Sequence, residues 1–152
     1  YAMKKISIGL MILLLCGCQS ASVNELQESV CTMNAGGAAV TTIFEHDDNY
    51  VKTQKNVNVV QLDMSAVSAD ELTATAEVAA AIYRTVKGIE YSYEIDDQFF
   101  IETLYIDFTA ASIEELSAIG IVRNADETTT QIGIKETLAM NREMGLECTE
   151  NE

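Results

Sequence analysis

Strict alternation between apolar and polar side chains runs through the segment from Ile89 to Ile95. In an extended strand, this alternation gives one face to an apolar set, namely Ile89, Tyr91, Tyr93 and Ile95. After an acidic turn at residues 96–98, an apolar run from Phe99 to Phe108 predicts a returning strand, with core candidates Phe100, Leu104, Ile106 and Phe108. Because a hairpin with one apolar face needs cover on that face, the chain is constrained to an antiparallel sheet covered on one side.

Three more strands precede this hairpin in the sequence. The first, from Val30 to Asn34, is joined through a Gly36-Gly37 turn to the β-branched segment from Ala38 to His46. A polar turn then leads to a long strand from Tyr50 to Asp63, whose apolar positions are Val51, Val57, Val59 and Val60. The three segments together predict an antiparallel meander.

Capping boxes and glycines mark the expected helices. Ser68 and Glu71 open a helix that stops at Gly88, and its apolar stripe comprises Leu72, Ala76, Ala79, Tyr83 and Val86. Ser112 and Glu115 form a second box, for a short helix that stops at Gly120. A last helix is expected from about Ile132 to Met144, with Gly145 after it.

The expected order is strand, strand, strand, helix, strand, strand, helix, helix, and Leu146–Thr149 can run beside the first strand. We therefore predict an α+β domain with an antiparallel sheet of about five strands and helices packed on one face. A length of 152 residues fits one domain. We place that domain at residues 30–150.

The amino-terminal segment has the pattern of a bacterial export leader. Met3-Lys4-Lys5 is a short basic stretch, and the apolar run from Ile6 to Leu15 falls short of the roughly 20 residues that a spanning helix needs. The run ends in Leu15-Cys16-Gly17-Cys18, which resembles the lipobox of bacterial lipoproteins because Gly17 supplies the small residue before Cys18. The resemblance implies cleavage before Cys18 and attachment of acyl chains, such as palmitate, at this cysteine.

We accordingly divide the chain into a lipoprotein signal peptide (1–17), a lipidated tether (18–29) and the domain. The alternative is an ordinary secretory signal or a membrane anchor. Each buried acyl methylene contributes ~0.8 kcal/mol, so two or three chains anchor a protein without a spanning helix. The expected location is the extracytoplasmic face of the cell membrane, or the periplasm or outer membrane of a Gram-negative host.

The four cysteines divide between these segments. Cys16 leaves with the leader and Cys18 carries lipid, so Cys31 and Cys148 remain at the two ends of the domain. Export leads to a compartment that permits disulfides, and we predict a bond between this pair. The alternative is two free, buried thiols.

The charge is strongly acidic, with 24 acidic and 9 basic side chains and a formal net charge of −15. Loss of Lys4 and Lys5 with the leader leaves 7 basic side chains and a charge of −17. This excess argues against nucleic acid as a partner, because phosphate would be repelled. Anionic headgroups would also be repelled, which favours a domain held off the membrane on a tether.

The order of elements resembles the YehR-like group of small bacterial lipoproteins, a family of unknown function (DUF1307). The resemblance is carried by the lipobox, the Thr-rich hairpin, the Ile89-Glu90-Tyr91-Ser92-Tyr93 strand, the Glu114–Leu116 helix and the closing Gly145-Leu146. It covers about residues 30–150. It implies fold and surface location, with no cofactor, activity or catalytic residue to transfer.

Two acidic turns are weak candidates for a metal site. The first holds Glu45, His46, Asp47 and Asp48, and the second holds Glu94, Asp96 and Asp97. Their ligand types suit Ca²⁺ or a borderline ion, although neither turn has EF-hand spacing. Carboxylates of the two turns would converge only if both lie at one end of the sheet. The alternative is that charged residues simply occupy turns.

No residue is assigned a catalytic role. His46 is the only histidine, and no Gly-x-Ser-x-Gly sequence accompanies it. Glu90 and Glu94 could form a carboxylate pair, but a solvated strand face explains them as well. Tyr91 and Tyr93 could line a ligand groove, although packing against the central helix is the favoured interpretation.

The sequence therefore favours a non-enzymatic, lipid-anchored binding module of the cell envelope, whose partner is an unknown protein or small molecule. A cation-binding domain and a carboxylate-dependent hydrolase are the alternatives. A hydrolase requires a deep pocket with converging carboxylates of raised pKa, whereas a purely structural envelope protein requires no concave apolar site.

Overall fold

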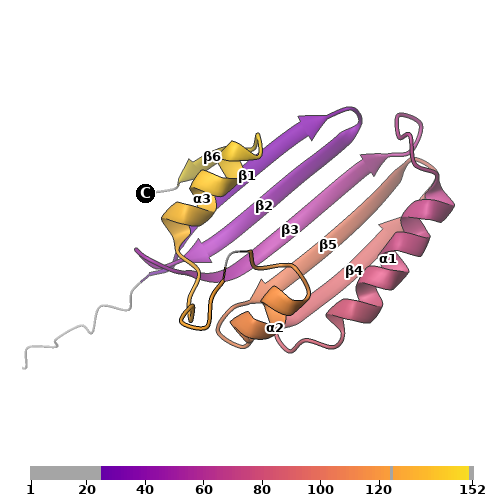
Figure 1. Ribbon diagram of the computed structural model, residues 1–152. Helices are drawn as coiled ribbons and strands as arrows, with labels where there is room; N and C mark the ends of the chain where they lie inside the picture. The colour runs from indigo at the N-terminus through magenta and orange to yellow at the C-terminus, as the bar shows by residue number, and fades with distance from the viewer. Residues whose placement is uncertain (1–24, 124, 151–152) are drawn as a thin grey trace, which may run out of the picture.

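A six-stranded antiparallel sheet forms the centre of the molecule, with strand order β4-β5-β3-β2-β1-β6. The computed structural model describes residues 25–123 and 125–150. The strands are β1 (Gln27–Ala35), β2 (Ala38–His46), β3 (Val51–Gln61), β4 (Ile89–Ile95), β5 (Phe99–Asp107) and β6 (Glu147–Glu150). Figure 1 shows β1 between its hairpin partner β2 and the short final strand β6, so the two ends of the domain lie side by side.

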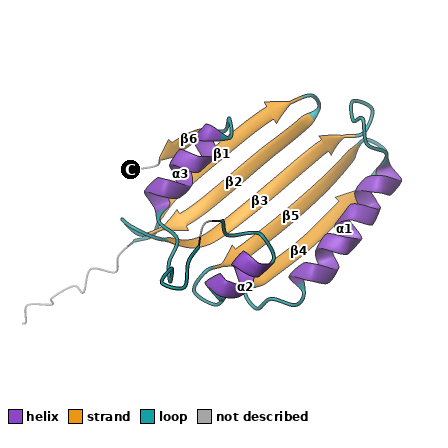
Figure 2. Cartoon of the chain, viewed as in Figure 1, coloured by secondary structure: helices purple, strands orange, loops and turns teal. Residues whose placement is uncertain are grey.

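The helices are α1 (Ala69–Tyr83), α2 (Ile113–Ala118) and α3 (Ile134–Glu143). Ser68 caps α1 in a complete capping box with Glu71. Ser112 caps α2 through a single bond from the Glu115 amide, without the reciprocal side-chain contact. Figure 2 shows the helices at the margins of the sheet, with α3 beside β6 and α1 beside β4.

The strand register places all three helices on one face of the sheet. Phe44, which packs with Ile134 and Leu138 of α3, stands opposite Gln54, and Gln54 stands opposite Ile106. Ile106 in turn packs with Leu116 of α2. These partners share one side of the pleat, because directly paired residues in an antiparallel sheet point the same way. The other face carries no helix among the described residues.

Two hydrophobic clusters, which share the partly buried Phe108, fix the helices to this face. The first contains the buried residues Cys31, Phe44, Val51, Ile134, Leu138 and Leu146 under α3. The second contains Val86, Ile106 and Leu116 under α2. α1 packs on β4 and β5, with Ala76 and Ala80 buried against the strands. The domain therefore has two cores on one sheet.

The α+β fold, the antiparallel sheet and the order of elements agree with the sequence prediction. The sheet has six strands instead of about five, because residues 147–150 pair with β1 along its Ser29–Thr32 segment. β1 also begins three residues earlier than expected, so it takes in Gln27–Ser29, which we had assigned to the tether. Ser29 is fully buried and belongs to the domain.

The central helix is shorter than its glycine stop suggests. α1 ends at Tyr83, and the chain then turns through residues 84–88 before β4 begins. Val86 in this turn is buried in the second cluster, so the apolar stripe continues beyond the helix. No helix of the described ranges is long and apolar enough to cross a membrane. The leader and Cys18 lie outside the described residues.

Candidate functional site

The two acidic turns lie at opposite ends of the sheet. Glu45, in the first turn, lies across the sheet from Thr53, near the start of β3. Ile95, which precedes the second turn, pairs with Phe100, and Phe100 pairs with Val60, near the end of β3. The carboxylates of the two turns therefore do not converge on a shared cation site, which would require both turns at one end of the sheet. Nowhere in the described ranges do three or more His, Cys, Asp or Glu side chains gather in a group that could hold a metal ion.

Within the first turn, the charged side chains already have local partners. Asp47 pairs with Lys52 at 2.7 Å and accepts from the Asn49 and Tyr50 amides. The hydrogen bond from Lys52 and the two backbone amides lower the pKa of the Asp47 carboxyl to about 2. Asp96 has the same capping role in the second turn, where the Gln98 and Phe99 amides lower its pKa. Both carboxylates thus stabilise turns.

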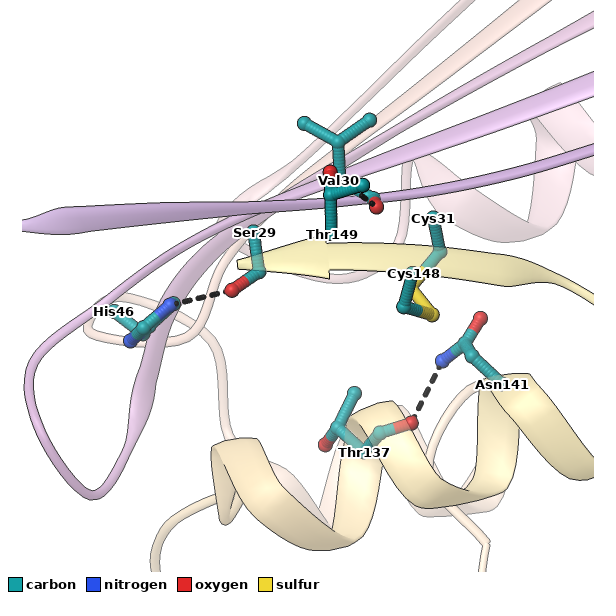
Figure 3. Close-up of a disulfide and its surroundings, with 8 residues drawn as sticks. All are labelled: Ser29, Val30, Cys31, His46, Thr137, Asn141, Cys148 and Thr149. Atoms are coloured by element: carbon teal, nitrogen blue, oxygen red, sulfur yellow. Dashed lines mark hydrogen bonds between the residues drawn. A yellow bond between two sulfur atoms is a disulfide. The ribbon is translucent and has the colours of Figure 1, made fainter. Parts of the chain in front are cut away.

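His46 is buried, with only 6% of its surface exposed. Its Nε2 lies 2.8 Å from the hydroxyl of Ser29, and its Nδ1 lies 2.7 Å from the backbone oxygen of Asp47. Ser29 is itself fully buried, so a substrate has no route to this pair. The pair resembles part of a hydrolase triad, but it forms a hydrogen bond in the interior of the domain (Figure 3).

The predicted disulfide between Cys31 and Cys148 is present in the structure. The two cysteines stand directly opposite each other on β1 and β6. Figure 3 shows the bond on the side of the strands that faces Thr137 and Asn141 of α3. It closes the first hydrophobic cluster and ties the last strand to the first.

Glu90 and Glu94 are exposed on the helix-free face of the edge strand β4. No helix covers this face in the described part of the chain, and the second acidic turn follows β4 directly. Tyr91 and Tyr93, in contrast, point toward α1. The Tyr83 and Tyr91 rings meet at 5.2 Å between centroids, and Tyr93 donates to Glu77. Packing against the central helix was the favoured prediction for these tyrosines, and the structure agrees.

A polar stripe separates the two hydrophobic clusters. Gln54, Asn56 and Asn58 of β3 lie on the helix-covered face, each half-buried. Gln54 donates from Nε2 to Asn56 Oδ1 at 3.0 Å. Figure 1 shows this middle part of the sheet, around β3, between the α3 and α1 sides. Polar side chains of this kind are mostly exposed in folded proteins, so a half-buried row of three is an informative feature of this face.

Glu102 of β5 anchors the stripe. Asn58 Nδ2 donates to one of its carboxylate oxygens at 2.8 Å, and the Tyr91 hydroxyl donates to the other at 2.6 Å. We name the set Gln54, Asn56, Asn58, Tyr91 and Glu102 the Glu102 site. Its members come from the three neighbouring strands β3, β5 and β4. The site therefore exists only when all three strands are in register.

The tyrosines near Glu102 are held in their protonated form. Burial, the hydrogen bond to Glu102 and the charge of that carboxylate raise the pKa of the Tyr91 phenol. Burial and the charge of Glu102 also raise the pKa of Tyr83. Because neither phenol gives up its proton near neutral pH, both remain neutral groups around one carboxylate.

An apolar groove adjoins this site. Its volume is about 470 Å³, and it is lined by Ala74, Thr75, Val78, Ala79, Ile82 and Tyr83 of α1 together with Ile119 after α2. We name it the α1 groove. Val78 and Ile82 are 62% and 43% exposed there. Tyr83 lines the groove and its ring contacts that of Tyr91, so Tyr83 links the apolar groove to the Glu102 site.

The sequence did not reveal the Glu102 site. Gln54, Asn56 and Asn58 recur at every second position, and this amide repeat inside a strand was the available signal. It could not be assigned to a face, because the neighbouring Val57 and Val59 compete for the buried side. The partnership with Glu102 joins positions 44 residues apart and depends on strand order.

Comparison with known proteins identifies the family. A model of proteins of unknown function, DUF1307, matches residues 29–147. The chain belongs to this family. No curated protein matches the chain significantly.

Two solved structures share the fold of this DUF1307 domain. The NMR structure of the E. coli YehR protein has a TM-score of 0.69 at 17% identity and covers 86% of this chain and 95% of that one. An NMR structure of a protein from Streptococcus pneumoniae TIGR4 has a TM-score of 0.59 at 12% identity, covering 99% and 100%. The YehR-like resemblance is confirmed. At these identities the likeness concerns the fold alone.

Proposed function

We propose that this DUF1307 protein is a lipid-anchored, extracytoplasmic binding module without catalytic activity. Its ligand would lie across the Glu102 site and the α1 groove. The observation that carries the proposal is the contact of Tyr83, which lines the apolar groove, with Tyr91 of the half-buried polar network. Sites for small ligands commonly combine apolar walls with a few placed polar groups.

The groove also favours a binding module over a purely structural envelope protein, which would need no concave apolar surface. The hydrolase and cation alternatives receive less support from the geometry. Glu90 and Glu94 stand on an open face, and the acidic turns are far apart along the strands. Glu102 is a single carboxylate that accepts from two neutral donors.

The anchor is proposed from the leader and from Cys18, which lie outside the described residues. Metabolic labelling with a palmitate analogue should mark the full-length protein in its host and should be lost in Cys18→Ala. Cys16→Ala is the matched control, because this cysteine is expected to leave with the leader. Persistent labelling of Cys18→Ala would contradict the anchor.

The binding surface is tested by amide NMR on the processed protein in phosphatidylglycerol nanodiscs, with a panel of small amphiphiles added. We expect saturable shifts at residues 74–83 and at the Asn58 side-chain amide. Ala79→Trp should fill the groove and abolish them. Ala81→Trp, on an exposed position of α1 outside the groove lining, should leave them intact. Saturable shifts confined to the helix-free face would overturn the proposal.

A further inference from the structure

The carboxylate of Glu102 has no basic residue among the elements around it. Its hydrogen bonds come from Asn58 and Tyr91, both neutral. The sequences of α1, α2, β4 and β5 contain no lysine, arginine or histidine, and the basic residues that follow α1 and α2, namely Arg84, Lys87 and Arg123, are exposed. β3 contains two lysines. Lys52 pairs with Asp47 in the first turn. Lys55 lies opposite Tyr105 and therefore points to the helix-free face. A half-buried carboxylate that only neutral donors satisfy can still gain from a cation.

Aromatic rings flank this carboxylate. The Tyr83 and Tyr91 rings are tilted by 58° with centroids 5.2 Å apart, and Tyr91 is bonded directly to Glu102. The faces of aromatic rings attract ammonium groups, and the attraction grows as water is excluded. Two rings beside one carboxylate are thus suited to a positively charged organic group.

The adjoining groove sets the size of the ligand. Its volume of about 470 Å³ falls within the range of roughly 300–1,000 Å³ typical of small-molecule sites. Its lining is aliphatic apart from Thr75 and Tyr83, so it suits an apolar body and not a second charge. An open groove of this volume offers too little area for a protein surface and favours a small ligand.

We propose that the Glu102 site and the α1 groove bind a small organic cation, an ammonium group carried on an apolar body. The ammonium would lie against Glu102 and the two tyrosine rings, with the apolar body along the groove. The chain's net charge of −15 would raise the local concentration of such a cation and speed its association. This inference rests on the proposed binding function and names the ligand class for the same surface.

The test uses n-hexylammonium chloride as the probe, with 1-hexanol and hexanoate as neutral and anionic analogues. Titration of the nanodisc-bound protein followed by amide NMR should give saturable shifts for hexylammonium at Asn58 and along α1. Hexanol should bind about tenfold more weakly and hexanoate more weakly still, because each lacks attraction to the carboxylate. Hexanol binding as tight as hexylammonium would overturn the cation inference and leave the proposed groove intact.

A matched pair of variants separates the site from the overall field. Glu102→Gln should weaken hexylammonium binding about tenfold, whereas Glu94→Gln should change it less than about twofold. Both variants remove one charge from adjacent strands, but Glu94 lies on the helix-free face. Equal weakening by the two would mean that only the general acidity attracts the probe, and the inference would be wrong.

Tyr91→Phe keeps the ring and frees one oxygen of Glu102, so it should bind hexylammonium at least as tightly as the natural protein. This variant tests the inference even if Glu102→Gln fails to fold; markedly weaker binding would contradict it.

Nα-acetyl-lysine methylamide carries the same ammonium on a peptide unit. If it bound more tightly than hexylammonium, the choice of a small ligand over a protein lysine would be overturned. No saturable shift with any probe would reject the site and the proposed function together.

Discussion

Ser29 and His46 form a buried polar pair whose proton arrangement can be worked out from the backbone. The Nδ1 of His46 contacts the carbonyl of Asp47, and a carbonyl can only accept. Nδ1 therefore carries the proton in the neutral ring, and Nε2 accepts from the hydroxyl of Ser29. Each polar atom of the pair is satisfied, as buried polar atoms generally must be.

Replacing Ser29 by alanine should lower the free energy of unfolding by about 1–3 kcal/mol, because His46 Nε2 would be left buried without a donor. Urea unfolding followed by circular dichroism measures the change. Ser92→Ala is the control, since Ser92 is exposed on the helix-free face of β4, and it should stay within about 0.5 kcal/mol. An equal effect from both substitutions would mean that the buried bond contributes nothing.

Gly88, at the junction between α1 and β4, combines two restrictions. Its φ is +84°, and a Cβ there would lie 2.9 Å from both the Ala111 nitrogen and the Asp107 oxygen. Gly120 has a similar φ of +81° but nothing within 4 Å of such a Cβ. Gly120→Ala should cost about 1–2 kcal/mol from backbone conformation alone. Gly88→Ala should cost about 1–3 kcal/mol more, because the backbone must move. Chemical denaturation of both variants decides, and equal costs would refute the steric contribution.

At the level of elements, β3 shows why local patterns predicted the strands but not the site. Val51 is buried on the helix-covered face, whereas Val57 and Val59, an even number of positions later, lie on the other face. The reason is an irregularity opposite Glu45 and His46, where Lys52 is an extra residue in β3. One inserted residue reverses the direction of every later side chain. The amides at 54, 56 and 58 thereby turn inward.

The helices could be predicted because their signals are local. Ser68 and Glu71 form the capping box that the sequence predicts, and Gly145 follows α3 with a φ of +94°. The Glu102 site needs β3, β5 and β4 in the correct order and register, and such long-range pairing has no local sequence signal. The disulfide could be predicted from the sequence, because only two cysteines remain in the domain once the leader is assigned.

β6 depends on the disulfide more than any other strand does. It has four residues and pairs only with β1, while Leu146 before it packs in the first cluster. The bond spans a sequence separation of 117 residues, for which loop-closure entropy predicts about 4–5 kcal/mol. The double variant Cys31→Ala/Cys148→Ala should therefore unfold about 2–5 kcal/mol more easily. Hydrogen exchange should also rise in β6 before it rises in β3 or β5.

Dithiothreitol provides the matched control for that prediction. It should reproduce the effect in the natural protein and have no effect on the double variant. Unchanged protection of β6 after complete reduction would show that pairing with β1 and the packing of Leu146 hold the strand without the covalent bond.

At the scale of the whole molecule, the two hydrophobic clusters share one sheet, and the amide stripe runs between them. The middle of the helix-covered face is therefore occupied by the polar side chains of Gln54, Asn56 and Asn58. The two halves are connected by strand β3 and by Phe108, which packs against both clusters. A ligand that spans the Glu102 site would add contacts across this division and should stabilise the fold through linkage.

The excess of acidic side chains makes each carboxylate part of a shared repulsive field as well as a local contact. Asp47 allows the two effects to be separated. Its folded pKa of about 2 lies below the ordinary value of 3.8 for an aspartate, so its contribution is fully present above about pH 4 and is lost as the pH falls toward 2. Asp47→Asn removes the ion pair with Lys52, the charge that strengthens the two amide hydrogen bonds, and one unit of repulsion. Asp48→Asn, in the same turn, removes the repulsion but only a 3.2 Å bond from Gln27.

We expect Asp47→Asn to be less stable than Asp48→Asn at pH 7, and we expect the two unfolding curves to converge as the pH falls to about 2, where Asp47 of the control becomes protonated. Thermal unfolding across this pH range measures the difference. In about 0.5 M NaCl the repulsion shrinks for both variants, because the Debye length falls to a few ångströms. The difference at pH 7 should then persist, because the hydrogen bonds from the Asn49 and Tyr50 amides are stronger to a carboxylate than to a neutral amide oxygen. A difference that stays constant from pH 7 to pH 2 would show that the carboxylate's charge has no part in the turn. In that case shape alone, which asparagine nearly shares, would have to explain the stability of the β2–β3 connection.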